Sequence, residues 1–333
     1  SYLRPRPIFL LTTLKSTNQP NRSWQIVCGI RKKIHTMAFT TKMTHVMGLM
    51  AVFASAFFFY LSTLIIRWSQ AQSDIAPSFF VFARFLLGLV VVIIEIRCRR
   101  VALRIRSYHL LLGRAIANTV AVYCFYTAVT LTTVAEANIL NMTYPIFIAL
   151  FTGLFWKAQR DAIAIVIVLV AFSGVGLVLA PARLGVHVHN LWGLASGVTA
   201  AAAIIYLNVH RRYHDTHTIL LVMFAFGTVA IGLLFHQHLF IPDRRELAYL
   251  SGSAAVGVAG QYLLTVGFRY VTAVEGSIIS STRILLAALL GPLLASDPPL
   301  TWSGWLGAGL IFSANVVLAL RKSATASSPD SNR

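Results

Sequence analysis

The chain has 333 residues, of which 57% are hydrophobic and only 11% are charged. Soluble globular proteins carry about 25% charged residues, so this composition excludes an ordinary water-soluble domain. The formal net charge is +18, but the basic residues lie in one tail and in short links between apolar runs, which argues against nucleic acid as a partner. The sequence therefore predicts an all-α integral membrane protein embedded in a lipid bilayer.

Residues 1–42 form a basic region of a different character. They contain eight Lys or Arg residues and no acidic residue, and their apolar runs are too short for the core of a secretory signal peptide. We expect a disordered cytoplasmic tail over these residues. An organelle transit peptide is an alternative, as is a stretch that precedes the native start at Met37, Met43 or Met47.

Ten apolar segments follow, separated by short connections, and most approach the roughly 20 residues that cross a bilayer. The last residues, 321–333, are polar, and we expect them to be disordered. We expect transmembrane helices over residues 47–66, 77–96, 109–130, 134–156, 162–180, 191–209, 218–235, 247–268, 272–294 and 302–320.

The distribution of basic residues predicts the orientation of these helices. Both tails and the links after the even-numbered segments hold 21 Lys or Arg residues, whereas the opposite links hold four. Basic residues concentrate in cytoplasmic links. Both termini are therefore expected in the cytoplasm, and an even number of crossings agrees with that. We expect a multi-pass protein of the plasma (inner) membrane.

One unusual stretch occurs twice in the chain. TTVAEANILNMTYP (132–145) returns in altered form as VTAVEGSIISSTRI (271–284). The same alignment, continued without a gap, pairs Tyr123 with Tyr262. Internal repeats of this kind indicate a duplicated structural unit.

We therefore predict two five-helix repeats, over residues 47–180 and 191–320. Because five is an odd number of crossings, the second copy enters the membrane from the opposite face, and the repeats are inverted. Inverted repeats give many transporters two related states, each open to one side, around a binding site near the middle of the membrane.

Three segments resemble the EamA-type carriers of the drug/metabolite transporter superfamily. They are FARFLLG (82–88), AEANILNMTYPIFIAL (135–150) and WSGWLGAGLIFSANVVLAL (302–320). The resemblance implies export or exchange of small metabolites, such as amino acids, nucleotide-linked compounds or toxic analogues, by a secondary carrier that uses no ATP. The chain accordingly has no GxxxxGK[ST] phosphate loop, and we expect no cofactor.

The chain departs from this family before its fifth and tenth helices. Family members often carry a Gly-Glu pair at these places. Here the sequence reads WKAQRD (156–161) and LASDPP (294–299), and Asp297 is the nearest acid in the second stretch.

Arg283 is the main candidate for a substrate contact. It follows Glu275 by eight residues, about 12 Å along a helix, and an arginine near mid-membrane is functional by default. Its repeat counterpart is Tyr144, next to Pro145, which removes a backbone donor and bends a helix. We hypothesise that Arg283, Tyr144 and Asn141 line a site for a carboxylate or phosphate. A purely structural pairing of Arg283 with a neighbouring helix is the alternative.

Other polar residues inside the apolar segments are weaker candidates. Arg84 either lines the same cavity or forms a structural pair, while Arg114 is expected to extend its charge to the cytoplasmic surface. Tyr123, Gln261 and Tyr262 occupy matched places in the third and eighth segments and line the site or form interhelical hydrogen bonds. Further candidates of the same kind are Asn118, Tyr206 and Asn208.

Two glutamates stand at helix starts. Thr133-x-x-Glu136 and Thr272-x-x-Glu275 both fit the capping box, in which the two side chains bond to free backbone N–H groups. The functional alternative is a pair of protonatable gates, since a carboxylate at a membrane edge can couple proton movement to transport.

We expect secondary active transport of a small polar metabolite by alternating access, coupled to protons or to an exchanged solute. The sequence is compatible with a homodimer. Two alternatives come from other classes: a membrane-embedded acyltransferase-like enzyme using His210 and Asp215, whose spacing fits an oriented general base, and a membrane scaffold that transports nothing. The histidines lack a supporting cysteine or carboxylate cluster, so we expect no metal site.

Overall fold

In the computed structural model the described residues are 22–100, 103, 108–155, 162–179, 188–210, 215–271 and 273–327, and the regular structure within them is entirely helical. The chain divides into two compact units, Ser1–His45 and Val46–Arg333. The described part of the first unit is the start of helix α1, which begins at Arg22. Residues 22–42 contain no proline, the residue that most strongly interrupts a helix, and they are helical although disorder is expected there.

Most expected segments correspond to one helix, and the fourth is divided into α4 and α5. The last helix extends to Ser327, into the tail that was expected to be disordered. The elements are α1 (Arg22–Gln70), α2 (Pro77–Arg99), α3 (Tyr108–Leu131), α4 (Val134–Asn141), α5 (Tyr144–Phe155), α6 (Ala162–Leu179), α7 (Asn190–His210), α8 (Thr216–Leu234), the short 3-10 helix η2 (His236–His238), α9 (Arg244–Tyr270), α10 (Ala273–Leu294) and α11 (Trp302–Ser327).

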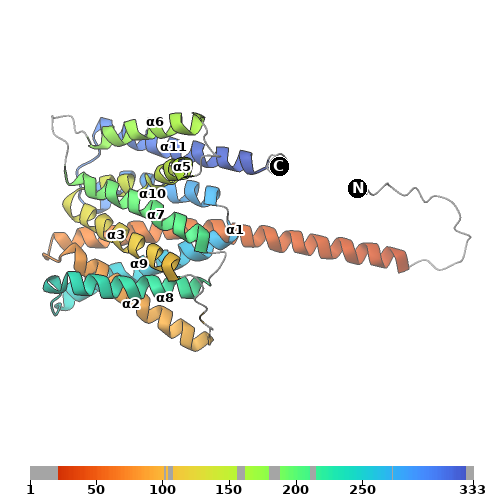
Figure 1. Ribbon diagram of the computed structural model, residues 1–333, viewed down its shortest axis with the longest axis horizontal. Helices are drawn as coiled ribbons and strands as arrows, with labels where there is room; N and C mark the ends of the chain where they lie inside the picture. Colours follow the sequence, from red (N-terminus) through yellow and green to blue (C-terminus); the bar gives the residue numbers. More distant parts are fainter. Residues whose placement is uncertain are drawn as a thin grey trace, which may run out of the picture. The chain divides into compact units, whose positions relative to one another are not determined.

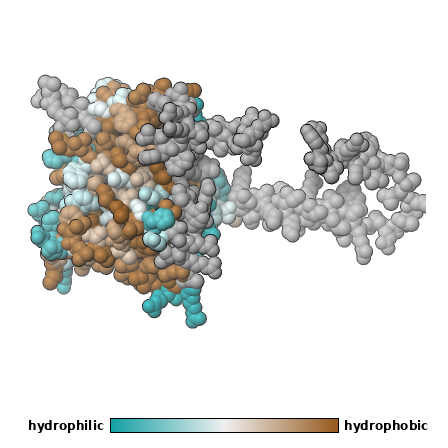
Figure 2. Space-filling model, viewed as in Figure 1, coloured by the Kyte–Doolittle hydropathy of each residue, from teal (hydrophilic) through white to brown (hydrophobic). Residues whose placement is uncertain are grey.

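The helices of the second unit pack side by side (Figure 1). Among the described residues, seven spans have the length and composition to cross a membrane, one of them formed by α4 and α5 together, and three shorter apolar stretches lie in α6, α10 and α11. Hydrophobic residues cover most of the coloured face in Figure 2, where a bilayer would contact them. A multi-pass helical membrane protein is the architecture that results.

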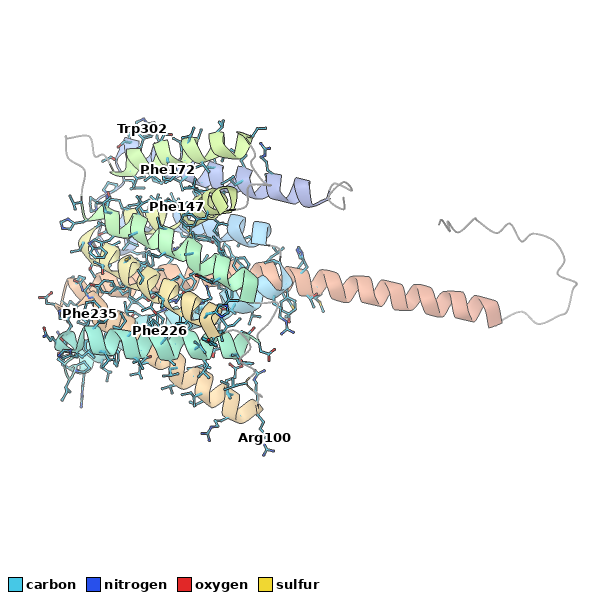
Figure 3. All side chains as sticks on the ribbon, in the orientation of Figure 1. Arg100, Phe147, Phe172, Phe226, Phe235 and Trp302 are labelled. Carbon is cyan, nitrogen blue, oxygen red and sulfur yellow. The ribbon has the colours of Figure 1, made fainter. Side chains whose placement is uncertain are left out.

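Two large buried apolar clusters, together with two smaller ones, hold the helices together. One large cluster combines residues of α1 to α4 and α8 to α10, and the other combines residues of α4 to α7, α10 and α11. Phe147 of α5 and Phe172 of α6 meet edge to face in the second cluster, with ring centroids 5.5 Å apart (Figure 3). Each cluster joins helices from both halves of the chain, so neither half has a core of its own.

Helices α2 and α8 interlock through two glycine–phenylalanine contacts. Gly88 of α2 faces the ring of Phe224, and Gly227 of α8 faces the ring of Phe85. The two rings meet at 6.1 Å between centroids. A small residue opposite each ring lets the helices approach closely, as at many helix interfaces in membranes.

An ion pair between a buried carboxylate and a partly exposed arginine anchors the start of α4. Asp297, in the connection between α10 and α11, has a side chain only 1% exposed, and its Oδ1 lies 2.7 Å from both Nε and Nη2 of Arg67 at the end of α1. Its other oxygen, Oδ2, accepts the N–H of Val134 at 2.7 Å. The carboxylate therefore joins three segments distant in sequence and satisfies a backbone donor at the first turn of α4.

The expected capping box at Thr133 and Glu136 is present. The Glu136 N–H donates to Thr133 Oγ1 at 3.1 Å, and the Thr133 N–H donates to Glu136 Oε2 at 3.4 Å. This confirms the structural interpretation of Glu136. The matching box at Thr272 and Glu275 lies outside the described residues, because Thr272 and the side chain of Glu275 are not among them.

Replacing Arg67 with alanine should destabilise the protein strongly. The substitution leaves the buried carboxylate of Asp297 without its cationic partner, and breaking a buried pair in this way costs about 3–5 kcal/mol. Thermal unfolding of the purified protein in detergent measures the effect. Arg97→Ala is the matched control, because Arg97 is exposed near the end of α2. Equal unfolding temperatures for the two variants would contradict this role of the ion pair.

Candidate binding cavity

The fourth expected helix breaks in the middle of its span. Helix α4 ends at Asn141 and α5 begins at Tyr144. Pro145 has no N–H, so the Asn141 carbonyl cannot receive the regular helical hydrogen bond from residue 145. The prediction that this proline disturbs the helix is confirmed, and the disturbance is a break rather than a bend.

Neighbouring groups satisfy the backbone at this break. The Thr143 hydroxyl and N–H both donate to the Leu140 carbonyl, at 2.6 and 3.2 Å. The Met142 carbonyl accepts from Asn315 Nδ2 of α11 at 2.9 Å. Irregular backbone is tolerated at membrane depth only where such partners or a cavity are available.

Two glycines of α7 allow that helix to lie directly on the break. A Cβ atom at Gly193 would lie 2.9 Å from the Leu140 Cβ, and one at Gly197 would lie 2.9 Å from the Leu140 carbonyl oxygen and closer still to the Thr143 hydroxyl. The pair forms a GxxxG pattern, which permits close helix contact in membranes.

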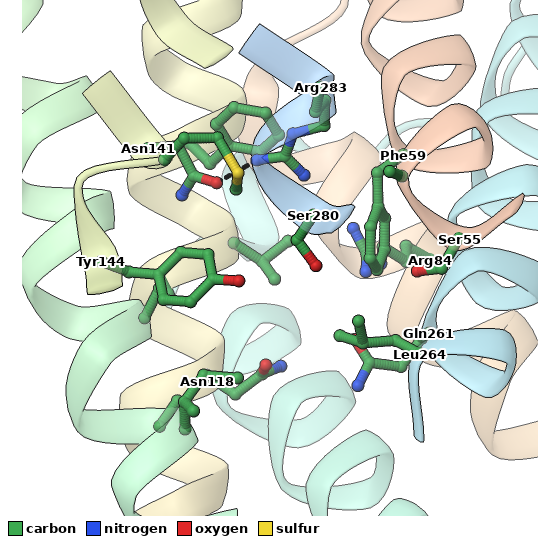
Figure 4. A pocket seen from close by; sticks show the side chains of 18 of the residues that line it. Ser55, Phe59, Arg84, Asn118, Asn141, Tyr144, Gln261, Leu264, Ser280 and Arg283 are labelled. Atoms are coloured by element: carbon green, nitrogen blue, oxygen red, sulfur yellow. Dashed lines mark hydrogen bonds between the residues drawn. The ribbon is translucent and has the colours of Figure 1, made fainter. Parts of the chain in front are cut away.

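A cavity of about 110 Å³ lies beside the break. Side chains from α1, α2, α3, α7, α9 and α10 line it together with Asn141, Met142 and Tyr144. Figure 4 shows polar side chains from several of these helices converging on the open space. The cavity draws on helices of both apolar clusters, so it lies where the two meet.

Arg283 of α10 donates to the side-chain oxygen of Asn141, the dashed contact in Figure 4. Asn141 in turn donates from Nδ2 to Ser196 Oγ of α7 at 2.9 Å. The guanidinium of Arg283 also lies over the rings of Phe125 and Phe59, with its Cζ 5.1 and 5.8 Å from their centroids. These contacts hold a buried charge through neutral and aromatic partners.

Arg84 of α2 approaches the same cavity. Its Nη1 donates to the Tyr126 hydroxyl at 3.0 Å, and its Cζ lies 5.1 Å from the centre of the Phe59 ring. Phe59 therefore contacts both Arg84 and Arg283. Arg84 has both of the roles that the sequence offers as alternatives. It lines the cavity, and it pairs with Tyr126 of a neighbouring helix.

The expectation for Arg114 is wrong. Arg114 does not extend to the surface: it is only 2% exposed, lines the cavity, and donates from Nη1 to the Ala203 carbonyl of α7. The small residues around Ala203 let α3 and α7 approach so closely that the guanidinium reaches a backbone oxygen. Asn118, one turn further along α3, lines the same cavity.

The structure brings together some of the other candidates and separates the rest. Tyr144 and Gln261 line the cavity, whereas Tyr123 and Tyr262 do not. The Tyr123 ring stacks on Phe235, with centroids 4.9 Å apart. Tyr262 is half-buried against the first apolar cluster.

The remaining candidates lie apart from the cavity or outside the described part. Glu136 lines a separate hollow with residues of the α10–α11 connection, and Tyr206 packs against Gly113 of α3. Asp215 immediately precedes α8. The side chains of Glu275, Asn208 and His210 are outside the described residues.

The sequence model of the EamA-like transporter family matches this chain twice, over residues 46–180 and 188–320. The chain belongs to the EamA-like transporter family. The resemblance inferred from the motifs is thereby confirmed. The paired matches cover most of the chain that follows the basic N-terminal region.

Two curated relatives are described as the pseudopaline exporter CntI, from Pseudomonas aeruginosa strains PAO1 and UCBPP-PA14. Each is 27% identical over 253 residues, which cover 75% of this chain and 88% of the relative. A solved structure, described only as the crystal structure of a protein, matches with a TM-score of 0.55 and 20% identity, covering 84% of this chain and 99% of that one. This last match concerns the fold alone.

Some lining residues of this EamA family member gave little signal in the sequence. Phe59 is one of many aromatic residues in an apolar segment. Ser280 had a detectable signal, because it precedes Arg283 by three residues and so lies on the same face of α10.

Replacing Gly197 with leucine should disturb the helix break and the cavity together. The new side chain would meet the Leu140 carbonyl and the Thr143 hydroxyl, and overpacking of this kind costs about 1–3 kcal/mol. Gly176→Leu is the matched control, since a Cβ at Gly176 has no described atom within 4 Å. Thermal unfolding in detergent should show a lower transition only for the Gly197 variant. An unchanged transition would contradict the close contact of α7 with the break.

Proposed function

We propose that this protein is a secondary active transporter of small solutes that carry a carboxylate or phosphate, working by alternating access. The observation that carries this proposal is Arg283, which is 5% exposed and faces a cavity beside a broken helix. A charged side chain inside a membrane protein marks a solute or ion pathway by default. Guanidinium groups bind carboxylates and phosphates through charge-assisted hydrogen bonds. Arg283, Tyr144, Asn141, Arg84 and Gln261 are the proposed substrate contacts.

We further propose ten membrane crossings arranged as two inverted five-helix repeats. The family model matches twice in succession, which supports two related halves. The helix contacts also support it: α2 packs on α8 and α9, while α3 packs on α7 and α8. A two-fold axis that relates the two halves would exchange α2 with α8 and α3 with α9. The contact of α2 with α9 is then equivalent to the contact of α8 with α3. An inverted repeat is the arrangement that gives a carrier two related states.

The proposed orientation places both termini in the cytoplasm of the plasma (inner) membrane. Its basis is the excess of Lys and Arg in the tails and in alternate links. In Figure 3, Arg100 at the end of α2 and Phe235 at the end of α8 lie at opposite ends of the bundle. That arrangement agrees with a basic cytoplasmic link after α2 and an external link after α8.

We propose export as the physiological direction, because the two curated relatives are described as exporters. Coupling to protons or to an exchanged solute is part of the proposal. Glu136 already has a structural role in the capping box, which favours a coupling site elsewhere. The enzyme alternative predicts that His210→Ala abolishes activity, whereas a carrier should retain transport in that variant.

Arg283→Ala should lower transport about ten- to hundredfold. Hydrogen bonds to charged groups contribute about 1.5–3 kcal/mol, and 1.4 kcal/mol corresponds to a factor of ten. Arg283→Lys should retain part of the activity, because it keeps the charge but loses the fork of donors. Radiolabelled glutamate, succinate, citrate and 3-phosphoglycerate serve as probes in counterflow with proteoliposomes.

Arg97→Ala is the control variant, since Arg97 is exposed and distant from the cavity lining. It should transport like the wild type. Unchanged kinetics in Arg283→Ala would contradict the proposed binding role. The absence of counterflow with every probe, in folded wild-type protein, would contradict the proposal of an anionic-solute carrier.

A further inference from the structure

Three arginines face the same cavity, although the sequence places only Arg283 near the middle of the membrane. They come from three different helices: Arg84 from α2, Arg114 from α3 and Arg283 from α10. Each is buried, with exposed fractions of 4%, 2% and 5%. All three are lining residues of one cavity of about 110 Å³.

The protein partners of these arginines carry no compensating charge. Arg84 donates to the Tyr126 hydroxyl, Arg114 to a backbone carbonyl, and Arg283 to an amide oxygen. None of the described lining residues is Asp or Glu. In addition, the Nε atoms of all three arginines are buried without a hydrogen-bond partner in the described part of the chain.

Arginine stays protonated in proteins, so the cavity wall carries three positive charges. Buried charges are normally paired or bound to an oppositely charged group. Arg84 and Arg283 also contact the same Phe59 ring, which places two like charges near each other. A solute with one negative charge compensates only one of the three positive charges, whereas a solute with two or three negative charges compensates most of them.

A zwitterionic amino acid is poorly matched to this cavity. Its ammonium group needs acceptors and a negative environment, and three guanidinium groups repel it. The Asn141 side-chain oxygen, a candidate acceptor, already receives a hydrogen bond from Arg283. Asn118 adds a further donor, because its Nδ2 is buried without a described partner. The wall thus carries positive charge in excess, and its other acceptors, such as the oxygens of Gln261, Tyr144 and Ser280, are neutral.

The arginines also suggest two positions for anionic groups. The Cζ atoms of Arg283 and Arg84 lie 5.8 and 5.1 Å from the centre of the Phe59 ring, and Figure 4 shows Asn118 on the far side of the open space from Arg283. Arg114 precedes Asn118 by one helical turn and shares its face of α3. A solute that spans the cavity would meet one cationic group at each end.

We infer that the transported solute carries at least two negatively charged groups, one bound at Arg283 and Arg84 and the other at Arg114 and Asn118. This inference rests on the proposed transport function and narrows its substrate class to dicarboxylates, tricarboxylates and comparable polyanions. Neutral-pH amino-acid zwitterions and monocarboxylates are weak ligands of this site.

Competition in the counterflow assay tests the inference with solutes grouped by charge. The probes are butyrate and pentanoate as monoanions, succinate and glutarate as dianions, propane-1,2,3-tricarboxylate as a trianion, and glutamine and leucine as zwitterions. The full chain in proteoliposomes at pH 7.5 should bind the best dianion or trianion at least tenfold more tightly than the best monoanion or zwitterion.

Substitution of Arg114 separates the two positions. Arg114→Gln should remove most of the preference for dianions over monoanions, because it removes the charge at one of the two anion positions and keeps Arg283 and Arg84 at the other. Arg114→Lys, which keeps the charge, should restore part of the preference. Arg97→Gln is the matched control and should behave like the wild type. Thermal stabilisation by the same solutes in detergent reports binding independently of transport.

Equal or tighter binding of monoanions or zwitterions by the wild type would overturn the inference while leaving the carrier function intact. So would a full preference for dianions in a folded Arg114→Gln variant. A failure of the transport proposal looks different, because then no solute of any charge class is moved or stabilises the protein.

Discussion

The structure depends on one constraint: polar groups placed inside a membrane must find their partners within the protein. The contact between Arg283 and Asn141 shows how the chain meets it. The guanidinium of Arg283 on α10 needs a hydrogen-bond acceptor, and the broken end of α4 supplies the side-chain oxygen of Asn141. At the same break, Ser196 of α7 accepts a hydrogen bond from Asn141, Gly197 lets α7 approach closely, and Asn315 of α11 donates to the Met142 carbonyl. The cavity lies where these requirements meet.

Helix α4 is held at both of its ends by polar contacts. At its start, the carboxylate of Asp297 accepts the N–H of Val134, and the capping box satisfies the N–H of Glu136. The carboxylate also ties the helix to α1 and to the α10–α11 connection. At its end, Asn141 connects it to the cavity. A ligand that displaced the Asn141–Arg283 contact would therefore act directly on a short helix that is fixed at its other end. In the proposed carrier, the cavity end of α4 is thus the end whose contacts differ between the ligand-free and ligand-bound states.

Much of the fold could be predicted from the sequence, because lipid exposure leaves a strong pattern of apolar segments. Polar residues inside those segments also stood out, which is how Arg283, Asn141, Tyr144, Arg84 and Gln261 were found. Such a pattern indicates how deep in the membrane a residue lies. It does not indicate which face of a helix lines a cavity, because that depends on how the helices pack.

Three residues of α3 illustrate this limit. Arg114 and Asn118 are one turn apart and share the cavity face, whereas Tyr123 lies on another face and stacks on Phe235. The position of Arg114 near a segment end predicts exposure, but the close approach of α7 buries its side chain. The partnership of Arg67 with Asp297 joins residues far apart in the sequence, and no local pattern encodes it.

The proposed carrier requires that water-soluble solutes reach the polar cavity inside the bundle. Thiol labelling tests it most directly, after Cys28, Cys98 and Cys124 are replaced by serine. We expect Ser280→Cys to react with a charged, membrane-impermeant thiol reagent in native membranes. Leu289→Cys, on the exposed apolar face of the same helix, should stay unmodified. An unreactive Ser280→Cys from both sides of the membrane would contradict the account.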